Sequence, residues 1–278
     1  MPSYDTPQPI TASLRFEVGD VRIAASKRAS TVVEVLPSNA SEEADIRAAQ
    51  QTDVTYADGV LTVKGPKNRS LFGRHGSIDV TVELPAGSHL RSTSPMGNHT
   101  CEGPLGDCRV TTSLGDIRLA EAGDTDLRTG HGSIAVERTV GKADIQGAGR
   151  IAIGEIMGPA TVANSNGDTT IGEITGDLTA RSSNGGITVG IAHASVEAKA
   201  ANGGIRVDEV ARGVVQLRTS AGNVEIGIRR STAAWLDVNS RIGTVRNALD
   251  AAEGPATTDE TVEIHARTGV GDIVVRRA

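Results

Sequence analysis

A glycine recurs along most of this chain at a nearly fixed interval. Successive steps are 18, 17, 17, 18, 18, 18, 19 and 21 residues. The glycines that mark the period are Gly97, Gly115, Gly132, Gly149, Gly167, Gly185, Gly203, Gly222 and Gly243. A fixed repeat of this length is the signature of stacked supersecondary units, in which each unit contacts only its neighbours. The period therefore predicts a solenoid.

Each repeat divides into two halves with the same pattern. Apolar residues lie two and four places after most marker glycines, as at Ile134 and Val136 or Ile151 and Ile153. A second glycine follows eight to ten residues later with its own alternating pair. Alternation with period two indicates a strand with one buried face. We therefore expect an all-β parallel solenoid whose coils of about 18 residues contain two short strands each.

The repeated glycines are expected to occupy tight turns with positive φ, a conformation that costs glycine nothing. Three of them follow an asparagine, which also tolerates left-handed φ and can form stacked side-chain ladders. We interpret these residues as structural rather than ligand-binding. The predicted turn residues are Gly115, Gly132, Gly149, Gly167, Gly185, Gly203, Asn166, Asn184 and Asn202.

The first 92 residues lack the regular period and are expected to form an irregular, β-rich cap continuous with the solenoid. Within this cap, Ser41–Gln50 predicts one short helix with Ser41 as N-cap and acidic residues in the first turn. Gly65–Gly76 predicts a polar loop. Residues 93–278 are expected to form the regular solenoid, interrupted by an irregular insertion near 247–260, within a single domain overall.

Several segments resemble a known family. The repeat SNGDTTIGEITGDLTARSSNGGITV, and FEVGDVRI followed by ADGVLTVKG, are similar to the bacterial β-strand-repeat family of unknown function often labelled putative adhesin. The resemblance covers nearly the whole chain. It implies a right-handed β-helix, and many relatives are secreted or membrane-tethered. It implies no catalytic motif.

Composition narrows the functional classes. The net charge is −6 with both signs interspersed, so we expect no nucleic-acid partner. The N-terminus shows no secretory signal and no apolar run approaches 18 residues, so we expect no membrane insertion and a cytoplasmic location. No nucleophile elbow, dinucleotide-binding fingerprint or phosphate-binding loop occurs, so neither a cofactor nor enzymatic activity is expected.

The two cysteines fall at core positions of one coil. Cys101 and Cys108 should face each other across a turn, where a disulfide is geometrically conceivable. For a reducing compartment, we favour the interpretation that both cysteines are free and act as small buried apolar residues. His99 lies in the same coil, but a zinc site would require a fourth ligand, so no metal is expected. The remaining histidines show no partner spacing, apart from a turn position at His131: His75, His89, His193 and His265.

Glu155 and Glu173 should be direct neighbours in adjacent coils. Two close carboxylates attract a cation or shift one pKa upward, and such pairs also perform acid–base chemistry in glycosidases. The structural interpretation is that these two glutamates simply lie on a solvated edge of the solenoid. The alternative is a glycan-binding or polysaccharide-active β-helix protein, which the scarcity of aromatic residues (2%) disfavours.

A flat face of small residues is predicted on the first strands of the middle coils. Such a face can pack against a protein partner or another copy. The function we expect is therefore a non-enzymatic scaffold or protein-interaction module that can self-associate. The residues of this face are Ser133, Ala135, Ala152, Thr170 and Thr188.

The C-terminal end is the other expected site of self-association. Thr261–Arg276 is predicted to be the last coil, with little chain beyond it to cover the strand edge. Arg276 and Arg277 could equally serve as edge protection, and both interpretations stay open.

Overall fold

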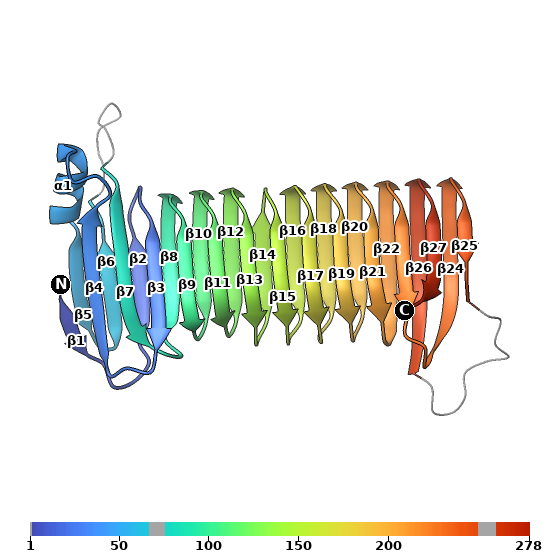
Figure 1. The fold of residues 1–278 in the computed structure, drawn as a ribbon, viewed down its shortest axis with the longest axis horizontal. Coiled ribbons are helices and arrows are strands. Elements are labelled where there is room, and N and C mark those ends of the chain that lie inside the picture. The colour runs from blue at the N-terminus through green and yellow to red at the C-terminus, as the bar shows by residue number, and fades with distance from the viewer. Residues whose placement is uncertain (1, 67–75, 250–259) are drawn as a thin grey trace. The chain divides into compact units, whose positions relative to one another are not determined.

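The fold was analysed in a computed structural model that describes residues 2–66, 76–249 and 260–278. These residues form two compact units, residues 1–140 and 141–278, which are described separately. Each unit contains two mostly parallel sheets (Figure 1). Most of the predicted loop Gly65–Gly76 and of the predicted insertion near 247–260 lies outside the described residues. The cap boundary at residue 92 and the handedness of the solenoid stay predictions.

In unit 1 the first strand of each sheet lies at the N-terminal end, and the other strands follow inwards. The first sheet contains β1 (Ser3–Asp5), β4 (Ser30–Pro37), β7 (Ile78–Pro85), β3 (Val21–Ser26), β9 (His99–Pro104), β11 (Ile117–Ala122) and β13 (Ile134–Thr139). The second contains β5 (Asp53–Ala57), β6 (Val60–Lys64), β2 (Thr11–Arg15), β8 (His89–Met96), β10 (Cys108–Leu114) and β12 (Thr125–His131).

In unit 2 the strands of each sheet follow one another towards the C-terminal end. One sheet contains β15 (Ile151–Ile156), β17 (Thr169–Ile174), β19 (Ile187–Ala192), β21 (Ile205–Val210), β23 (Val224–Ile228), β27 (Ile273–Arg277) and β25 (Val245–Asn247). The other contains β14 (Ala143–Gly147), β16 (Ala160–Asn166), β18 (Leu178–Asn184), β20 (Val196–Asn202), β22 (Gly213–Ala221), β26 (Glu260–Val270) and β24 (Thr232–Ile242).

Each coil consists of one strand from each sheet, and equivalent positions of successive coils are aligned. Ile153 pairs with Ile171, which pairs in turn with Val189. All three side chains are at most 3% exposed. Apolar residues on alternate positions therefore stack into ladders between the two sheets, as the period-two pattern predicted.

The N-terminal end of unit 1 is covered by antiparallel strands. The coil formed by β6 and β7 lies outside the coil formed by β2 and β3, although it comes later in the sequence. β5 and β4 then pair antiparallel with β6 and β7. Helix α1 (Glu43–Gln50) lies against β4 (Figure 1). The helix was predicted, but its expected cap was wrong. Glu42 is the N-cap, because Ser41 lies inside the preceding turn, in which Asn39 accepts hydrogen bonds from the amides of Ser41 and Glu42.

The C-terminal end of unit 2 also departs from sequence order. The last coil of the chain, β26 and β27, lies between β22/β23 and β24/β25 (Figure 1). Ala266 of β26 pairs with Leu217 on one side and Val238 on the other. The expectation that Thr261–Arg276 forms the terminal coil is therefore wrong. The outermost strands are β24 and β25.

Arg276 and Arg277 consequently do not protect the outer edge. The guanidinium of Arg276 donates to Glu225 at 3.0 Å, and that of Arg277 donates to the carbonyl oxygens of Arg229 and Thr232. Both side chains thus bond the coil of β26 and β27 to residues between 225 and 232. Within the described residues, no helix is long and apolar enough to cross a membrane.

Candidate interaction surfaces

One corner between the two sheets is built on one glycine per coil. In unit 1, Gly115 and Gly132 have φ of 151° and 144°. A Cβ atom at Gly115 would lie 2.0 Å from the carbonyl oxygen of Gly97 in the adjacent coil. The backbone conformation and the stacked neighbour therefore both exclude a side chain. In unit 2, positive φ is found at Gly167, Gly185 and Gly203, but Gly149 is not among the described glycines with positive φ.

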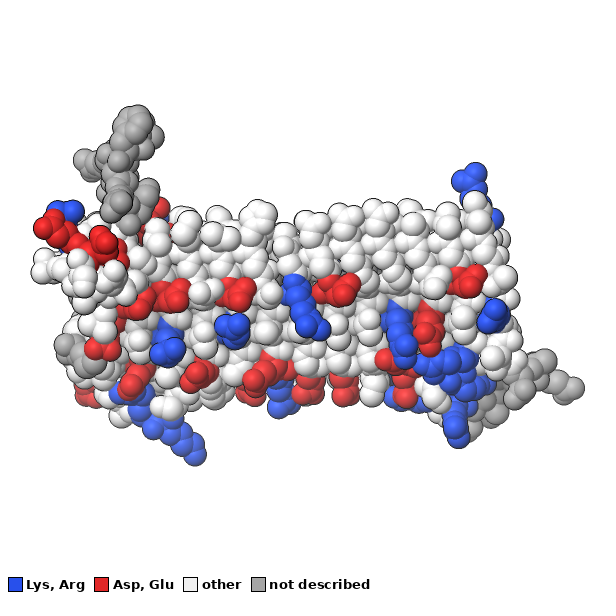
Figure 2. Space-filling model, turned by 45° about the horizontal axis from the view of Figure 1, so that its top comes forward, with Lys and Arg blue, Asp and Glu red and all other residues white. Residues whose placement is uncertain are grey.

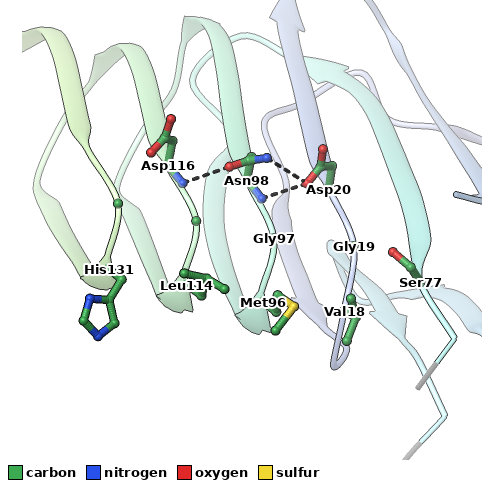
Figure 3. Close-up of a pocket in the computed structure, with 12 residues that line it drawn as sticks. Val18, Gly19, Asp20, Ser77, Met96, Gly97, Asn98, Leu114, Asp116 and His131 are labelled. Carbon is green, nitrogen blue, oxygen red and sulfur yellow. Dashed lines mark hydrogen bonds between the residues drawn. The ribbon is translucent and has the colours of Figure 1, made fainter. Parts of the chain in front are cut away.

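In several coils, an Asp or Asn directly after the glycine accepts a hydrogen bond from the equivalent amide of the adjacent coil. The amide nitrogen of Asn98 donates to Asp20 Oδ1 at 2.8 Å, and that of Asp116 donates to Asn98 Oδ1 at 2.9 Å (Figure 3). Ser133 continues the ladder by donating to Asp116 Oδ1 at 2.8 Å. Sequence reasoning missed this ladder, although its signal, Asx after the marker glycine, is present in the repeat.

The same ladder occurs in unit 2. Gly186 donates its amide hydrogen to Asp168 Oδ1 at 2.8 Å, and Thr244 donates to Asp272 Oδ1 at 2.8 Å. The backbone and hydroxyl hydrogen bonds from Thr244 lower the pKa of Asp272 below its usual value. These bonds satisfy corner amides that would otherwise have no backbone partner, so the residues have a structural role.

Apolar side chains precede the corner glycines of unit 1. Val18, Met96, Leu114 and His131 occupy equivalent positions in neighbouring coils and line one side of a cavity of about 480 Å³ (Figure 3). Met96 and Leu114 are each 47% exposed. The corner of unit 1 therefore presents a short apolar row to solvent.

In unit 2 the equivalent positions carry the predicted asparagines. Asn184 Nδ2 donates to Asn166 Oδ1 at 3.2 Å, and Asn202 Nδ2 donates to Asn184 Oδ1 at 3.0 Å. The structure thus places these three residues in a hydrogen-bonded side-chain ladder on an exposed corner. Figure 2 shows a band along each unit in which Lys, Arg, Asp and Glu side chains are few.

The cysteines and His99 are buried in unit 1. Both thiols are free. A hydrogen bond with Cys108, together with burial, raises the pKa of Cys101 well above its usual range. His99 Nε2 lies 2.9 Å from Ser92 Oγ, and burial lowers the pKa of His99 to about 4. In the described part of the chain, no group of three or more His, Cys, Asp or Glu side chains is arranged to bind a metal ion.

The predicted carboxylate neighbours lie in unit 2. Glu155 and Glu173 are register partners on β15 and β17. Glu173 also bonds to His193, whose Nε2 lies 2.8 Å from Glu173 Oε1. The expectation that His193 lacks a partner is therefore wrong, because the tight coil brings residues 20 positions apart together. The same correction applies to His89, whose Nδ1 accepts a hydrogen bond from the amide of Asp107. His75 lies outside the described residues.

The predicted flat face is divided between the two units. Ser133 and Ala135 lie on or beside β13 in unit 1, where Ala135 is exposed and Ser133 is half-buried. Ala152, Thr170 and Thr188 form one ladder across β15, β17 and β19 in unit 2. Thr170 is exposed and its two neighbours are half-buried.

The outermost coil of unit 2, residues 232–249, is called the open end. β24 and β25 are the last described strands of their sheets, with a partner strand on one side only. Leu236 and Val238 point towards the core yet are only half-buried, and Val245 is 43% exposed. Their register partners in the next coil, Ile264, Ala266 and Ile273, are fully buried. In the part of the chain that the structure describes, no further strand therefore covers the core of the outermost coil.

The outward face of the open end carries an aromatic and charged cluster. Trp235 is 57% exposed, and its ring packs edge-on against His265 with centroids 5.4 Å apart. Arg267 donates two hydrogen bonds to the carboxylate of Asp237, at 2.9 and 2.6 Å, and lowers its pKa below the usual value. His265 Nε2 also lies 2.7 Å from Glu263 Oε1, so the expectation that His265 lacks a partner is wrong as well.

The chain matches the profile of a known protein family. The profile of the Toastrack DUF4097 family matches residues 12–276. No curated protein matches the chain. Solved structures with a similar course include a putative adhesin from Parabacteroides merdae (12% identity, TM-score 0.40) and one from Bacteroides fragilis (12% identity, TM-score 0.37). The first alignment covers 100% of this chain and 95% of that one, and the second covers 99% and 95%.

Proposed function

Since the chain belongs to the Toastrack DUF4097 family, whose match spans nearly its whole length, we propose that it is a non-enzymatic β-solenoid module that binds a protein partner through the open end. The observation that carries this proposal is the half-exposed core row Leu236, Val238 and Val245 beside an unpaired strand edge. Monomeric proteins usually protect such edges, because the free N–H and C=O groups pair readily with another chain.

Chemistry also favours binding over catalysis. The buried polar cluster at His99, Cys101 and Cys108 lies between the sheets, where no substrate can reach it. The carboxylate pair offers a weak case for glycan chemistry, because Glu173 is already bonded to His193. The chain's single tryptophan, a natural platform for sugar rings, lies on β24 and belongs to the open end.

The flat face is the second surface we propose for binding. Its exposed member Thr170 lies on β17, within unit 2 like the open end, so one variant of each surface can be compared in the same unit. Val238→Lys places a charge on the exposed core row, where a lysine can reach solvent. Thr170→Lys places the same charge on the flat face.

The test is cross-linking of the tagged full chain in native lysate, followed by mass spectrometry of the linked peptides. We expect links to map to residues 232–249, and Val238→Lys to reduce their yield at least tenfold while Thr170→Lys leaves it unchanged. The opposite pattern would move the interface to the flat face. Links unaffected by either variant would contradict both assignments.

The glycan alternative has its own experiment. Glu155→Gln combined with Glu173→Gln should leave any glycan binding or cleavage by the full chain unchanged. Loss of such an activity in this double variant, with the folded state intact by circular dichroism, would favour the polysaccharide-active interpretation.

A further inference from the structure

The edge strand of the open end is long, and no described strand pairs with its outer edge. β24 spans 11 residues, whereas the outermost N-terminal strand β1 spans 3. Its sequence, TAAWLDVNSRI, contains neither proline nor lysine, the residues that most often block edge pairing. An edge of this length can accept a whole strand.

The pattern of β24 is compatible with its own copy. When a strand pairs antiparallel with itself across a two-fold axis, inward residues meet inward residues and outward residues meet outward ones. With Val238 on the axis, Trp235 lies opposite Arg241 of the partner subunit and Asp237 lies opposite Asn239 of the partner subunit. The first pair suits a cation–π contact and the second a hydrogen bond.

The neighbouring register is less favourable. An axis through Asp237 would place this carboxylate directly opposite its own copy, and like charges in opposite positions destabilise a strand pair. An axis through Val238 instead places an apolar side chain against itself on the exposed core row. The paired strands would cover Leu236 and Val238, the inward side chains that the open end leaves half-buried.

We infer that the occupant of the open end is a second copy of this chain, bound by antiparallel pairing of the two β24 strands with Val238 on the two-fold axis. This inference rests on the proposed function of the open end and names its partner. The interface is isologous, so it closes at a dimer and does not propagate into a fibre.

Cysteine cross-linking tests the pairing and its register together. The Cα atoms of Val238→Cys and of its copy would lie about 5 Å apart, within the range that a disulfide spans. Leu236→Cys and Ser240→Cys would each be offset from their own copies by four residues, about 13 Å, and cannot bridge. The native thiols Cys101 and Cys108 are buried, so they give little background.

Under mild oxidation of the full chain, we expect Val238→Cys to form disulfide dimers at least tenfold faster than either offset variant. A mixture of Leu236→Cys and Ser240→Cys chains should form the mixed dimer, because these positions lie opposite each other. Thr161→Cys, exposed on β16 and outside both proposed surfaces, controls for collisional cross-linking. No Val238→Cys dimer above this control, or faster dimerisation of an offset variant, would overturn the inference.

Failure of self-pairing can be separated from failure of the proposed function. A chain that sediments as a monomer up to several hundred micromolar, with no Val238→Cys dimer, overturns the second copy as partner. If Val238→Lys still abolishes the cross-links to another protein in lysate, the open end remains the binding surface. If those cross-links persist, the proposed function fails too.

Discussion

The two terminal coils of this protein show how differently the same repeat can end. At the N-terminal end, the inward residues of the outermost parallel coil are fully buried: Leu61, Val63 and Val82 each have 0% exposure, and the antiparallel strands β4 and β5 pair with the edges of this coil. At the C-terminal end, the equivalent inward residues Leu236 and Val238 are half-exposed. The same alternating pattern therefore gives either a closed core or a half-exposed one, according to whether further strands cover it.

The largest effect should come from removing a core leucine at each end. Leu61→Ala should lower the free energy of unfolding by roughly 2–5 kcal/mol, because the fully buried site cannot collapse around the cavity. Leu236→Ala, the same chemical change on a half-exposed side chain, should cost about 1 kcal/mol. Urea unfolding monitored by circular dichroism would measure both. Equal losses would mean that the two ends are equally covered.

The second prediction concerns how the free energy of unfolding of unit 1 depends on pH. Burial lowers the pKa of His99 to about 4, whereas an unfolded histidine titrates near 6.5. Below 6.5 the unfolded chain binds a proton that the folded chain does not, so stability is lost as pH falls from about 6.5 to 4. The loss should reach about 3 kcal/mol at pH 4.

His99→Gln keeps a polar group near Ser92 but removes the titration. Its unfolding free energy should fall less steeply than that of the parent chain over this pH range. An unchanged slope would assign the pH dependence to other groups.

A corner glycine gives the next largest effect. Gly115→Ala should destabilise unit 1 by about 2 kcal/mol, because φ is 151° and a Cβ atom would meet the carbonyl oxygen of Gly97 at 2.0 Å. Gly59→Asn is the matched control: its φ is 75°, which asparagine tolerates, and nothing lies within 4 Å of an added Cβ. Thermal unfolding of both variants separates the effect of stacking from that of simply replacing a glycine.

The smallest effect should come from the exposed asparagine ladder. Asn184→Ala removes the hydrogen bonds to Asn166 and Asn202, which are solvent-exposed and together contribute about 1 kcal/mol or less. Chemical denaturation should detect a shift of this size. A loss above about 2 kcal/mol would contradict this small contribution of the exposed ladder.

The repeat itself could be predicted from sequence because it has a local cause. A glycine that fits the corner, followed by apolar residues two and four places on, fixes both the turn and the buried face of the strand after it. Residues such as Ile153 and Ile171 could therefore be assigned to the core, and each is at most 3% exposed.

The order of the coils could not be predicted, because any coil carries the same alternating pattern. Ala266 of the last coil pairs with Leu217 on one side and with Val238 on the other. Nothing in the local sequence shows that this coil lies between β22 and β24 instead of beyond β24. The contact of His193 with Glu173 was missed for a related reason. It depends on which corner residues of adjacent coils lie side by side, and the irregular coil lengths hide that spacing.

The most direct test of the open end uses the chain's single tryptophan. Trp235 lies on β24 and is 57% exposed, so its fluorescence reports on this surface alone. Acrylamide quenching should be measured from low to several hundred micromolar protein. We predict that quenching falls as concentration rises, with the same midpoint as the monomer–dimer transition in sedimentation, and that Val238→Lys abolishes the change. Quenching that stays constant while the chain self-associates would contradict the account, because the contact would then lie elsewhere.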